Sequence, residues 1–350
     1  MPGAEPSSST GVSELKEVVA GEAAPAAGGA PTARVPDFFI AGHQKCGTTA
    51  LYSMLKNHPQ IFMPDVKEPL YFASDLRSRF RVRSPAAQRL RTLDGYLSLF
   101  SAASPEQLVG DASPQYLRSR AAPSAIAEMQ PDARIIVILR EPASFLRSFH
   151  LQMVSSNVES QRDLRKAVAL EEVRREGRRI PRRCHHPDAL QYSDHVRYVE
   201  QLSRFRAVFP PEQVLVLIYE DFRRDNVATV RTVLRFLEVD DSSPIETIEI
   251  KPVEGVRSLQ LHHLANAARV ARLNPVAAGP FGRAVNALTP RPLRSEAFRA
   301  LWRRVVYRAP PPPDEEFMLE LRRRFKGEVV AISDYLGRDL VTEWGYDGID

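Results

Sequence analysis

The sequence predicts an α/β fold of three layers, in which helices flank a central parallel sheet. Three short apolar runs have the form of buried strands, at residues 37–41, 133–140 and 214–219. Segments with helical periodicity lie between them, and strands that alternate with helices pair in parallel. A loop with two glycines joins the first strand to the first helix, so we expect the fold to be P-loop-like.

The expected helices share a stripe of apolar residues at helical spacing. Leu51, Met54 and Leu55 form the stripe of the first helix, and Pro142 occupies the first turn of the second. In chain order, helices are predicted at residues 48–55, from 142 to about 153, 195–209, 227–237 and roughly 315–336.

The N-terminal residues differ from the rest in composition. Residues 1–34 are mostly Ala, Gly, Pro, Ser and Thr, too few of them apolar to offset the entropy of ordering, and they predict a disordered tail. Residues 35–350 are predicted to form a single domain, interrupted only by four prolines at 310–313 before the last helix.

The overall composition is that of a globular protein with a mild positive charge. Of the 350 residues, 43% are hydrophobic and 26% charged, with a formal net charge of +5. No apolar run approaches the ~18 residues of a membrane span, so we expect no transmembrane segment. The small charge surplus does not indicate a nucleic-acid partner, and nothing specifies an oligomeric state. Cys46 and Cys184 are too few for a disulfide scaffold.

The loop after the first strand, residues 42–49 (GHQKCGTT), has the features of a phosphate-binding site. Backbone amides at a helix N-terminus bind anions, and glycines allow a close approach. Gly42 and Gly47 keep the spacing of the nucleoside-triphosphate loop GxxxxGK[ST], but Thr48 replaces its lysine and Lys45 lies inside the loop. An ordinary ATPase is therefore disfavoured, and a glycine-rich turn with a solvent-facing lysine remains the alternative.

With the stretch that follows, HPQIFMPDVKEPLYF, the loop resembles the start of the sulfotransferases that use 3′-phosphoadenosine-5′-phosphosulfate (PAPS). The resemblance is to the branch with heparan sulfate sulfotransferases and bacterial relatives. It runs from about residue 37 to 345 and is strongest in the first half. It implies that the 5′-phosphosulfate of PAPS is held by residues of the loop, namely Gln44, Lys45, Cys46, Gly47, Thr48 and Thr49.

Arg140 and Ser148 match the family's motif for the 3′-phosphate of PAPS, an arginine and a serine eight positions apart. Arginine at the end of a parallel strand lies where α/β sheets bind ligands, and its charged fork suits phosphate. The alternative is an Arg140–Glu141 pair beside a serine that faces solvent.

Residues 67–72 (KEPLYF) resemble the segment that carries the family's general base. Transfer of a sulfuryl group to a hydroxyl needs an acceptor for the hydroxyl proton. The resemblance implies that Glu68 is this base and that Lys45 neutralises the leaving oxygen. Lys67 would hold the donor or stabilise the charge that develops. An exposed Lys–Glu pair is the alternative.

Other stretches match the family less well. Residues 111–116 (DASPQY) resemble a segment ending in [S/T]P-x-Y, but Ala112 stands where glycosaminoglycan enzymes often have lysine. Lys251 and Arg257 are weak candidates for the family's late cofactor loop. The arginine-rich stretch 162–183 is interpreted as a solvated helix and loop, with a lid over an anionic acceptor as the minority interpretation. His150 is expected on a helix surface.

The predicted activity is transfer of a sulfuryl group from PAPS to a hydroxyl of a glycolipid, glycan or small alcohol, with an amine as the alternative acceptor group, and without a metal. A small-molecule or nucleotide kinase and a non-catalytic nucleotide-binding protein are the alternatives. Golgi members of the family carry a membrane anchor and a disulfide near the late loop. This sequence shows neither, so we expect a cytoplasmic protein.

Overall fold

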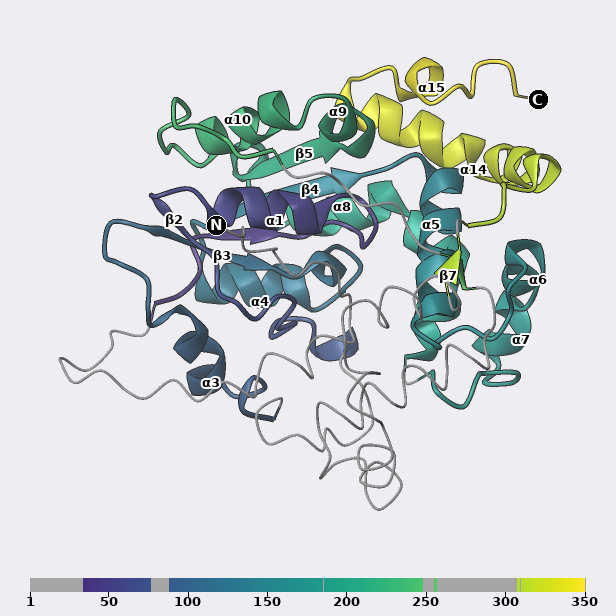
Figure 1. Cartoon of the computed structure of the whole chain (residues 1–350), viewed down its shortest axis with the longest axis horizontal. Coiled ribbons are helices and arrows are strands. Elements are labelled where there is room, and N and C mark those ends of the chain that lie inside the picture. The colour runs from purple at the N-terminus through teal and green to yellow at the C-terminus, as the bar shows by residue number, and fades with distance from the viewer. Residues whose placement is uncertain are drawn as a thin grey trace, which may run out of the picture. The chain divides into compact units, whose positions relative to one another are not determined.

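The structure is a computed structural model that describes residues 34–76, 88–184, 186–247, 255–256, 307–308 and 310–349 (Figure 1). The described residues form two compact units. The first holds those up to Phe145, those from Ser193 to 247 and those from Leu319 onward. The second holds Leu146–Tyr192 and the described residues between 255 and Met318.

A parallel sheet forms the centre of the first unit (Figure 1). Within the described residues it has five strands, in the order β2-β3-β1-β4-β5, and each neighbouring pair is parallel. The strands are β1 (Phe38–Ile40), β2 (Ile61–Phe62), β3 (Leu108–Ala112), β4 (Arg134–Leu139) and β5 (Val214–Ile218). The predicted α/β class with a central parallel sheet is confirmed.

The core of the sheet is apolar on both faces. All of β1 is fully buried, and so is β4 from Ile135 to Leu139. A strand covered on both faces needs apolar residues at successive positions rather than at alternate ones, which explains the continuous runs in the sequence.

Helices pack on this sheet in pairs: α1 contacts α10, and α4 contacts α8. The helices wholly within the first unit are α1 (Thr48–Lys56), α3 (Leu93–Leu97), α4 (Ala122–Met129), α8 (Tyr198–Arg206), α9 (Tyr219–Arg224), α10 (Asn226–Phe236) and α15 (Leu340–Glu343). Two more, α5 (Pro142–Ser155) and α14 (Glu315–Leu336), contribute residues to both units. The predicted stripe of α1 is buried, as are Thr48, Ala50 and Tyr52.

The sheet also contains strands that we did not predict. β2 and β3 were missed, and β3 has Gly110 and Asp111 in its interior, which interrupt the apolar run. The third predicted strand ends one residue early, because Tyr219 begins α9. The helix predicted over 195–209 is shorter, since a 3-10 turn, η7 (Tyr192–Val196), precedes α8.

The second unit contains two short helices, α6 (Leu164–Ala169) and α7 (Glu171–Arg175), and an antiparallel pair, β6 (Gly255–Val256) with β7 (Tyr307–Arg308). Arg174 makes a two-pronged ion pair with Glu159, at 2.7 and 2.8 Å, and Tyr192 donates to the same carboxylate. Both charged residues are buried, so the interpretation of this stretch as wholly solvated is wrong for Arg174. A charge this deep is tolerated because two hydrogen bonds join it to an opposite charge.

His150 is also buried rather than on a helix surface, and its Nε2 lies 2.8 Å from the carbonyl oxygen of Gln161. Residues 1–33 of the predicted tail lie outside the described residues, as do Lys251 and Arg257. Arg34 is described, and its guanidinium donates to the carbonyl of Ser104 at 2.6 Å. In the described part of the chain, no helix combines the length and apolar character of a membrane span.

Candidate active site

The loop between β1 and α1 follows the central strand of the sheet. Two of its residues have left-handed backbone conformations, Lys45 at φ 68° and Gly47 at φ 85°. A Cβ at Gly47 would lie 2.8 Å from Cδ1 of Phe222, so glycine is required both for conformation and for space. Gly47 precedes α1, whose first turn contains no acidic residue. The loop therefore presents a helix N-terminus suited to an anion.

Arg140 lies at the end of β4, next to this loop. Its Nη1 donates to the carbonyl of Lys45 at 2.9 Å, and its guanidinium lies over the ring of Tyr219, 4.5 Å from the centroid. Tyr198 donates to the carbonyl oxygen of Arg140 at 2.8 Å. The Nε of Arg140 is buried and has no hydrogen-bond partner among the described residues.

Three cations face one another around the loop. Burial lowers the pKa of Lys45, and the neighbouring charges of Arg140 and then Lys67 lower it further. Positive charges that disfavour one another are stabilised by an anion placed among them. This arrangement suits a phosphate or sulfate group.

Glu68 is joined to the same loop by side-chain hydrogen bonds. Gln44 donates to Oε2 of Glu68 at 3.3 Å, and Lys67 donates to Oε1 at 3.3 Å and to Oγ1 of Thr49 at 2.9 Å. Glu68 is only 6% exposed, so the Lys–Glu pair is not the solvated pair of the alternative interpretation. The structure thus brings together most of the predicted site: Gln44, Lys45, Thr49, Lys67, Glu68 and Arg140.

Two other predicted residues of the phosphate loop are buried. Thr48 begins α1, and Cys46 is fully buried, with burial as the main cause that raises the pKa of its thiol to about 12. A thiol with this pKa stays protonated, which fits the interpretation of Cys46 as a small residue that fills the loop.

Ser148 is buried on α5, in the second unit. Its meeting with Arg140 at a 3′-phosphate stays a prediction. Glu141 does not serve as the partner that the alternative interpretation assigned to Arg140. Its carboxylate accepts from the amides of Ala143 and Ser144, at 3.0 and 2.7 Å, and so caps the start of α5.

Sequence reasoning missed the residues that support the loop from other elements. Tyr219 and Phe222 come from α9, and only the position of Tyr219 at the end of a predicted strand indicated a role. His43 lies within the loop and is buried, with its Nε2 2.7 Å from Oε1 of Gln201 on α8. Because Gln201 uses its own N–H groups on the carbonyls of Asp194 and His195, its oxygen faces the histidine and accepts from it. Burial lowers the pKa of His43 to about 4, so the ring is neutral.

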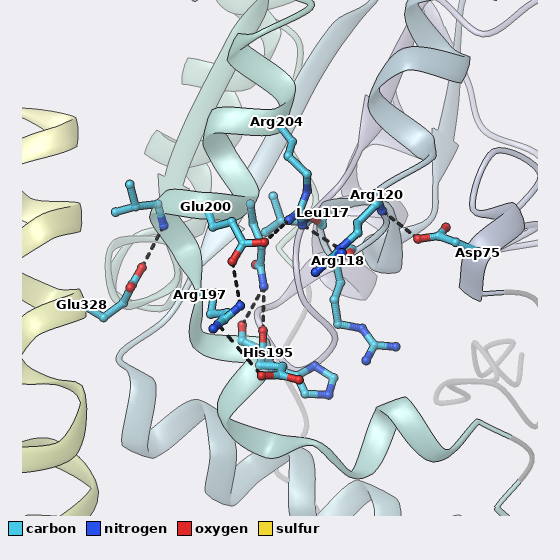
Figure 2. Close-up of polar contacts among 12 residues, drawn as sticks. Asp75, Leu117, Arg118, Arg120, His195, Arg197, Glu200, Arg204 and Glu328 are labelled. Carbon is cyan, nitrogen blue, oxygen red and sulfur yellow. Dashed lines mark hydrogen bonds and ion pairs between the residues drawn. The ribbon is translucent and has the colours of Figure 1, made fainter. Parts of the chain in front are cut away.

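The chain after β3 is fixed against α8 and against Asp75 (Figure 2). Arg204 of α8 donates to Glu200 at 2.9 Å and to the carbonyls of Leu117 and Arg118 at 3.2 and 3.3 Å. The amide of Arg120 donates to Asp75 at 2.8 Å. The stretch from Glu68 to Asp75 is therefore fixed, at its C-terminal end, to the chain after β3.

Curated relatives of the chain act on carbohydrates by name. It is 29% identical over 248 residues to carbohydrate sulfotransferase 15 of Mus musculus, covering 59% of this chain and 44% of that protein. It is 30% identical over 218 residues to the bifunctional heparan sulfate N-deacetylase/N-sulfotransferase 3 of Homo sapiens, covering 59% of this chain and 22% of that protein. The chain thus spans less than half the length of these relatives.

These relatives overturn the prediction of a cytoplasmic location. Carbohydrate and heparan sulfate sulfotransferases are Golgi-type enzymes and not cytoplasmic ones. The prediction was wrong because it rested on a missing cysteine pair and a missing anchor, and such absences do not determine a compartment.

Among solved structures, a sulfotransferase from Alicyclobacillus acidocaldarius is similar over most of its length. It is 32% identical, with a TM-score of 0.54, and the match covers 69% of this chain and 96% of that one. Residues 36–243, more than half of this chain, match the model of the Sulfotransferase family. This places the chain with sulfotransferases rather than with the kinases that share a similar loop. The chain belongs to the Sulfotransferase family, whose members transfer a sulfuryl group from PAPS to an acceptor.

Proposed function

We propose that this chain transfers a sulfuryl group from PAPS to a hydroxyl of a glycan. The observation that carries the proposal is a cluster of three cations, those of Lys45, Lys67 and Arg140, around one loop at a helix N-terminus. The Glu68 carboxylate is hydrogen-bonded to the same cluster. The names of the curated relatives, carbohydrate and heparan sulfate sulfotransferases, support a glycan acceptor.

The residues present fit the phosphosulfate and phosphate groups of PAPS. The buried Nε of Arg140 lacks a partner among the described residues, and a charged donor in that state favours an anionic ligand. At Gly47, the ring of Phe222 fills the place where a Cβ would lie, so the loop packs closely on α9. We propose that Arg140 with Ser148 holds the 3′-phosphate, and that Lys45 with the loop from Gln44 to Thr49 holds the phosphosulfate.

In the proposed reaction, Glu68 takes the proton of the acceptor hydroxyl while the new S–O bond forms. PAPS supplies the sulfuryl group, and the S–O bond to its 5′-phosphate breaks. Lys45 meets the charge that develops on the phosphate oxygen, and Lys67 donates to Glu68 and Thr49, which fixes the base beside the loop. These steps require no metal.

Labelled PAPS tests the activity and the acceptor class together. [³⁵S]PAPS is incubated with N-desulfated heparan sulfate before and after N-acetylation of its free amines, with chondroitin and with a lipid extract, and the labelled fraction is identified. We expect label in a glycan. Lys45→Ala removes a cation at the site and lowers both labelling and affinity for adenosine 3′,5′-bisphosphate (PAP). Lys56→Ala, at the far end of α1, is the matched control and keeps both.

Nucleotide selectivity tests the assignment of Arg140. PAP is expected to bind about 30- to 160-fold tighter than AMP, because a charge-assisted pair with the 3′-phosphate contributes roughly 2–3 kcal/mol. Isothermal titration measures both constants. Equal affinity for PAP and AMP, or label only in lipid, would contradict the corresponding part of the proposal.

A further inference from the structure

We propose that Asp111 is a positioning residue. It orients the hydroxyl groups of Ser113 and Tyr116, which hold residues 68–72, the segment that carries Glu68 (the Glu68 segment). The inference rests on the proposed function in one respect, the assignment of Glu68 as the base. It concerns residues 111–116 (DASPQY), a segment to which sequence reasoning gave no role.

Asp111 lies in the interior of the first unit, near the end of β3, with no exposed surface. Three hydroxyl groups donate to its carboxylate. Ser113 donates to Oδ1 at 2.7 Å, while Tyr116 and Tyr96 donate to Oδ2 at 2.8 and 2.9 Å. A buried carboxylate is costly unless it is hydrogen-bonded, and these donors provide that.

Two of the three hydroxyls also accept from the Glu68 segment. The amide of Leu70 donates to Oγ of Ser113 at 3.2 Å, and the amide of Phe72 donates to the hydroxyl of Tyr116 at 3.5 Å. A hydroxyl has a single proton, so one that donates to Asp111 turns its lone pairs toward other donors. By accepting the protons of both hydroxyls, Asp111 leaves the oxygens of Ser113 and Tyr116 as acceptors for the amides of the segment.

The segment needs such support because its backbone is strained. Glu68 and Leu70 have left-handed conformations, at φ 59° and 55°, which residues with a side chain rarely adopt. Strain of this kind persists only where the surroundings determine the backbone at several points. The amide of Glu68 also donates to the carbonyl of Ala112, at 3.1 Å. Alternate amides of the segment are thus fixed to β3 and to the turn after it.

The position of the base depends on this support. The hydrogen bonds of Glu68 to Gln44 and Lys67, both 3.3 Å, are long and require the carboxylate to stay where the strained backbone places it. If Ser113 and Tyr116 no longer accept from the segment, its backbone relaxes toward ordinary conformations. Glu68 then leaves the loop, although the groups that bind nucleotide keep their places.

A matched pair of tyrosine variants tests the inference. Tyr116→Phe and Tyr96→Phe each remove one hydroxyl from Oδ2 of Asp111, and both rings are fully buried. Of these two hydroxyls, that of Tyr116 accepts from the amide of Phe72 in the described part of the chain. We expect hydrogen exchange at the amides of Leu70 and Phe72, measured in the PAP complex, to be faster in Tyr116→Phe by about fivefold or more relative to Tyr96→Phe.

Ser113→Ala is the second test, because it removes the shorter of the two bonds to the segment. We expect kcat to fall about tenfold with PAP affinity and KM for PAPS within about twofold of the original protein. Ser113→Thr keeps a hydroxyl and restores kcat, which a general loss of stability would not allow. Turnover is followed with [³⁵S]PAPS and N-desulfated heparan sulfate, or as release of free sulfate to water if that glycan is not labelled.

A double variant separates failure of this inference from failure of the proposed function. If Ser113 acts through Glu68, adding Ser113→Ala to Glu68→Gln lowers turnover no further. Additive losses, or exchange rates equal in the two tyrosine variants, would overturn the positioning role. Near-normal turnover of Glu68→Gln alone would instead overturn the assignment of the base. The exchange measurements would still decide whether the Tyr116 hydroxyl, oriented by Asp111, holds the segment.

Discussion

Glu68 receives hydrogen bonds from one neutral and one charged donor, Gln44 and Lys67. The carboxylate is almost fully buried, and its neighbours fix both of its oxygens. Hydrogen bonds to both oxygens orient the carboxylate, and a general base has to be positioned in this way. The alternative interpretation, an exposed ion pair, would contribute little to either stability or chemistry.

Replacing Glu68 by glutamine separates proton transfer from binding. Glu68→Gln keeps the size and polarity of the side chain but cannot take a proton. We expect turnover to fall by roughly 10²–10⁴-fold with PAP affinity nearly unchanged, since the loss concerns the transition state alone. Single-turnover transfer and calorimetry with PAP measure the two effects. A variant that keeps its turnover would show that another group accepts the proton.

Asp111 should make stability depend on pH. Burial raises the pKa of its carboxyl from 3.8 to about 6, against the opposing effect of its hydroxyl donors, and the nearby Glu68 charge raises it as well. The folded state therefore binds the proton more tightly than the unfolded state. The resulting stabilisation is complete below pH ~4 and is lost as pH rises to about 6, with a magnitude of up to about 3 kcal/mol.

His43 makes stability depend on pH in the opposite direction, over a pH range that overlaps that of Asp111. Its pKa falls from 6.5 to about 4 on burial, so the unfolded chain binds the extra proton. Stability from the neutral ring is complete above pH ~6.5 and is lost as pH falls toward 4. Urea unfolding from pH 4 to 8 for the original protein, Asp111→Asn and His43→Gln separates the two. If the free energy of unfolding of a variant differs from that of the original protein by the same amount at every pH, the pKa shift of the replaced residue is contradicted.

At the scale of elements, the strands that were predicted and those that were missed differ for a physical reason. β1, β4 and β5 are apolar because both faces of the sheet are covered around them. β3 lies in the same sheet, but Gly110 makes room there for the side chains of Phe38 and Met63, and Asp111 is stabilised by hydroxyls that come from elsewhere. The residues that pack on Gly110 and donate to Asp111 lie elsewhere in the sequence. The residue pattern of β3 alone therefore could not predict a strand.

The same reason limits what could be predicted of the site. Lys45 and Glu68 were recognised from motifs that are contiguous in sequence. The ring of Tyr219 under Arg140 and the hydroxyls that face Asp111 depend on contacts between elements, and an isolated tyrosine or serine indicates none of them. The left-handed backbone at Glu68 was equally invisible, because glutamate does not favour that conformation.

Two glycine variants test the packing of β3. In Gly110→Ala the new Cβ would lie 2.3 Å from Cζ of Phe38 and 2.4 Å from Sδ of Met63, both buried side chains, and we expect a loss of about 1–3 kcal/mol or more. Gly327→Ala is the control on α14, where a Cβ meets no atom within 4 Å. There we expect a gain of about 0.5–1 kcal/mol, since alanine favours the helix. Denaturant unfolding that ranks the two variants in the other order would contradict this packing.

For the molecule as a whole, we expect residues 1–33 to be dispensable. Their composition provides neither an apolar core nor any residue of the candidate site. A protein that begins at Arg34 keeps the hydrogen bond from this arginine to Ser104. Its PAP affinity and transfer rate should match those of the full chain within about twofold, and its thermal midpoint should be nearly the same. A folded truncation without activity would reveal a function in the removed residues.

The order in which the chain is synthesised affects its first unit. Glu141, which caps α5, accepts from the hydroxyl of Tyr346 at 2.6 Å, and Glu220 accepts from the indole of Trp344 at 3.2 Å. During synthesis on a ribosome, these two hydrogen bonds therefore cannot form before residue 346 has been translated. A nascent chain can pair its strands earlier, but the edge formed by β4 and β5 acquires its last contacts only then. We expect a chain stalled before Trp344 to be captured by chaperones and trimmed by proteases, even though the five strands of the described parallel sheet have already been synthesised.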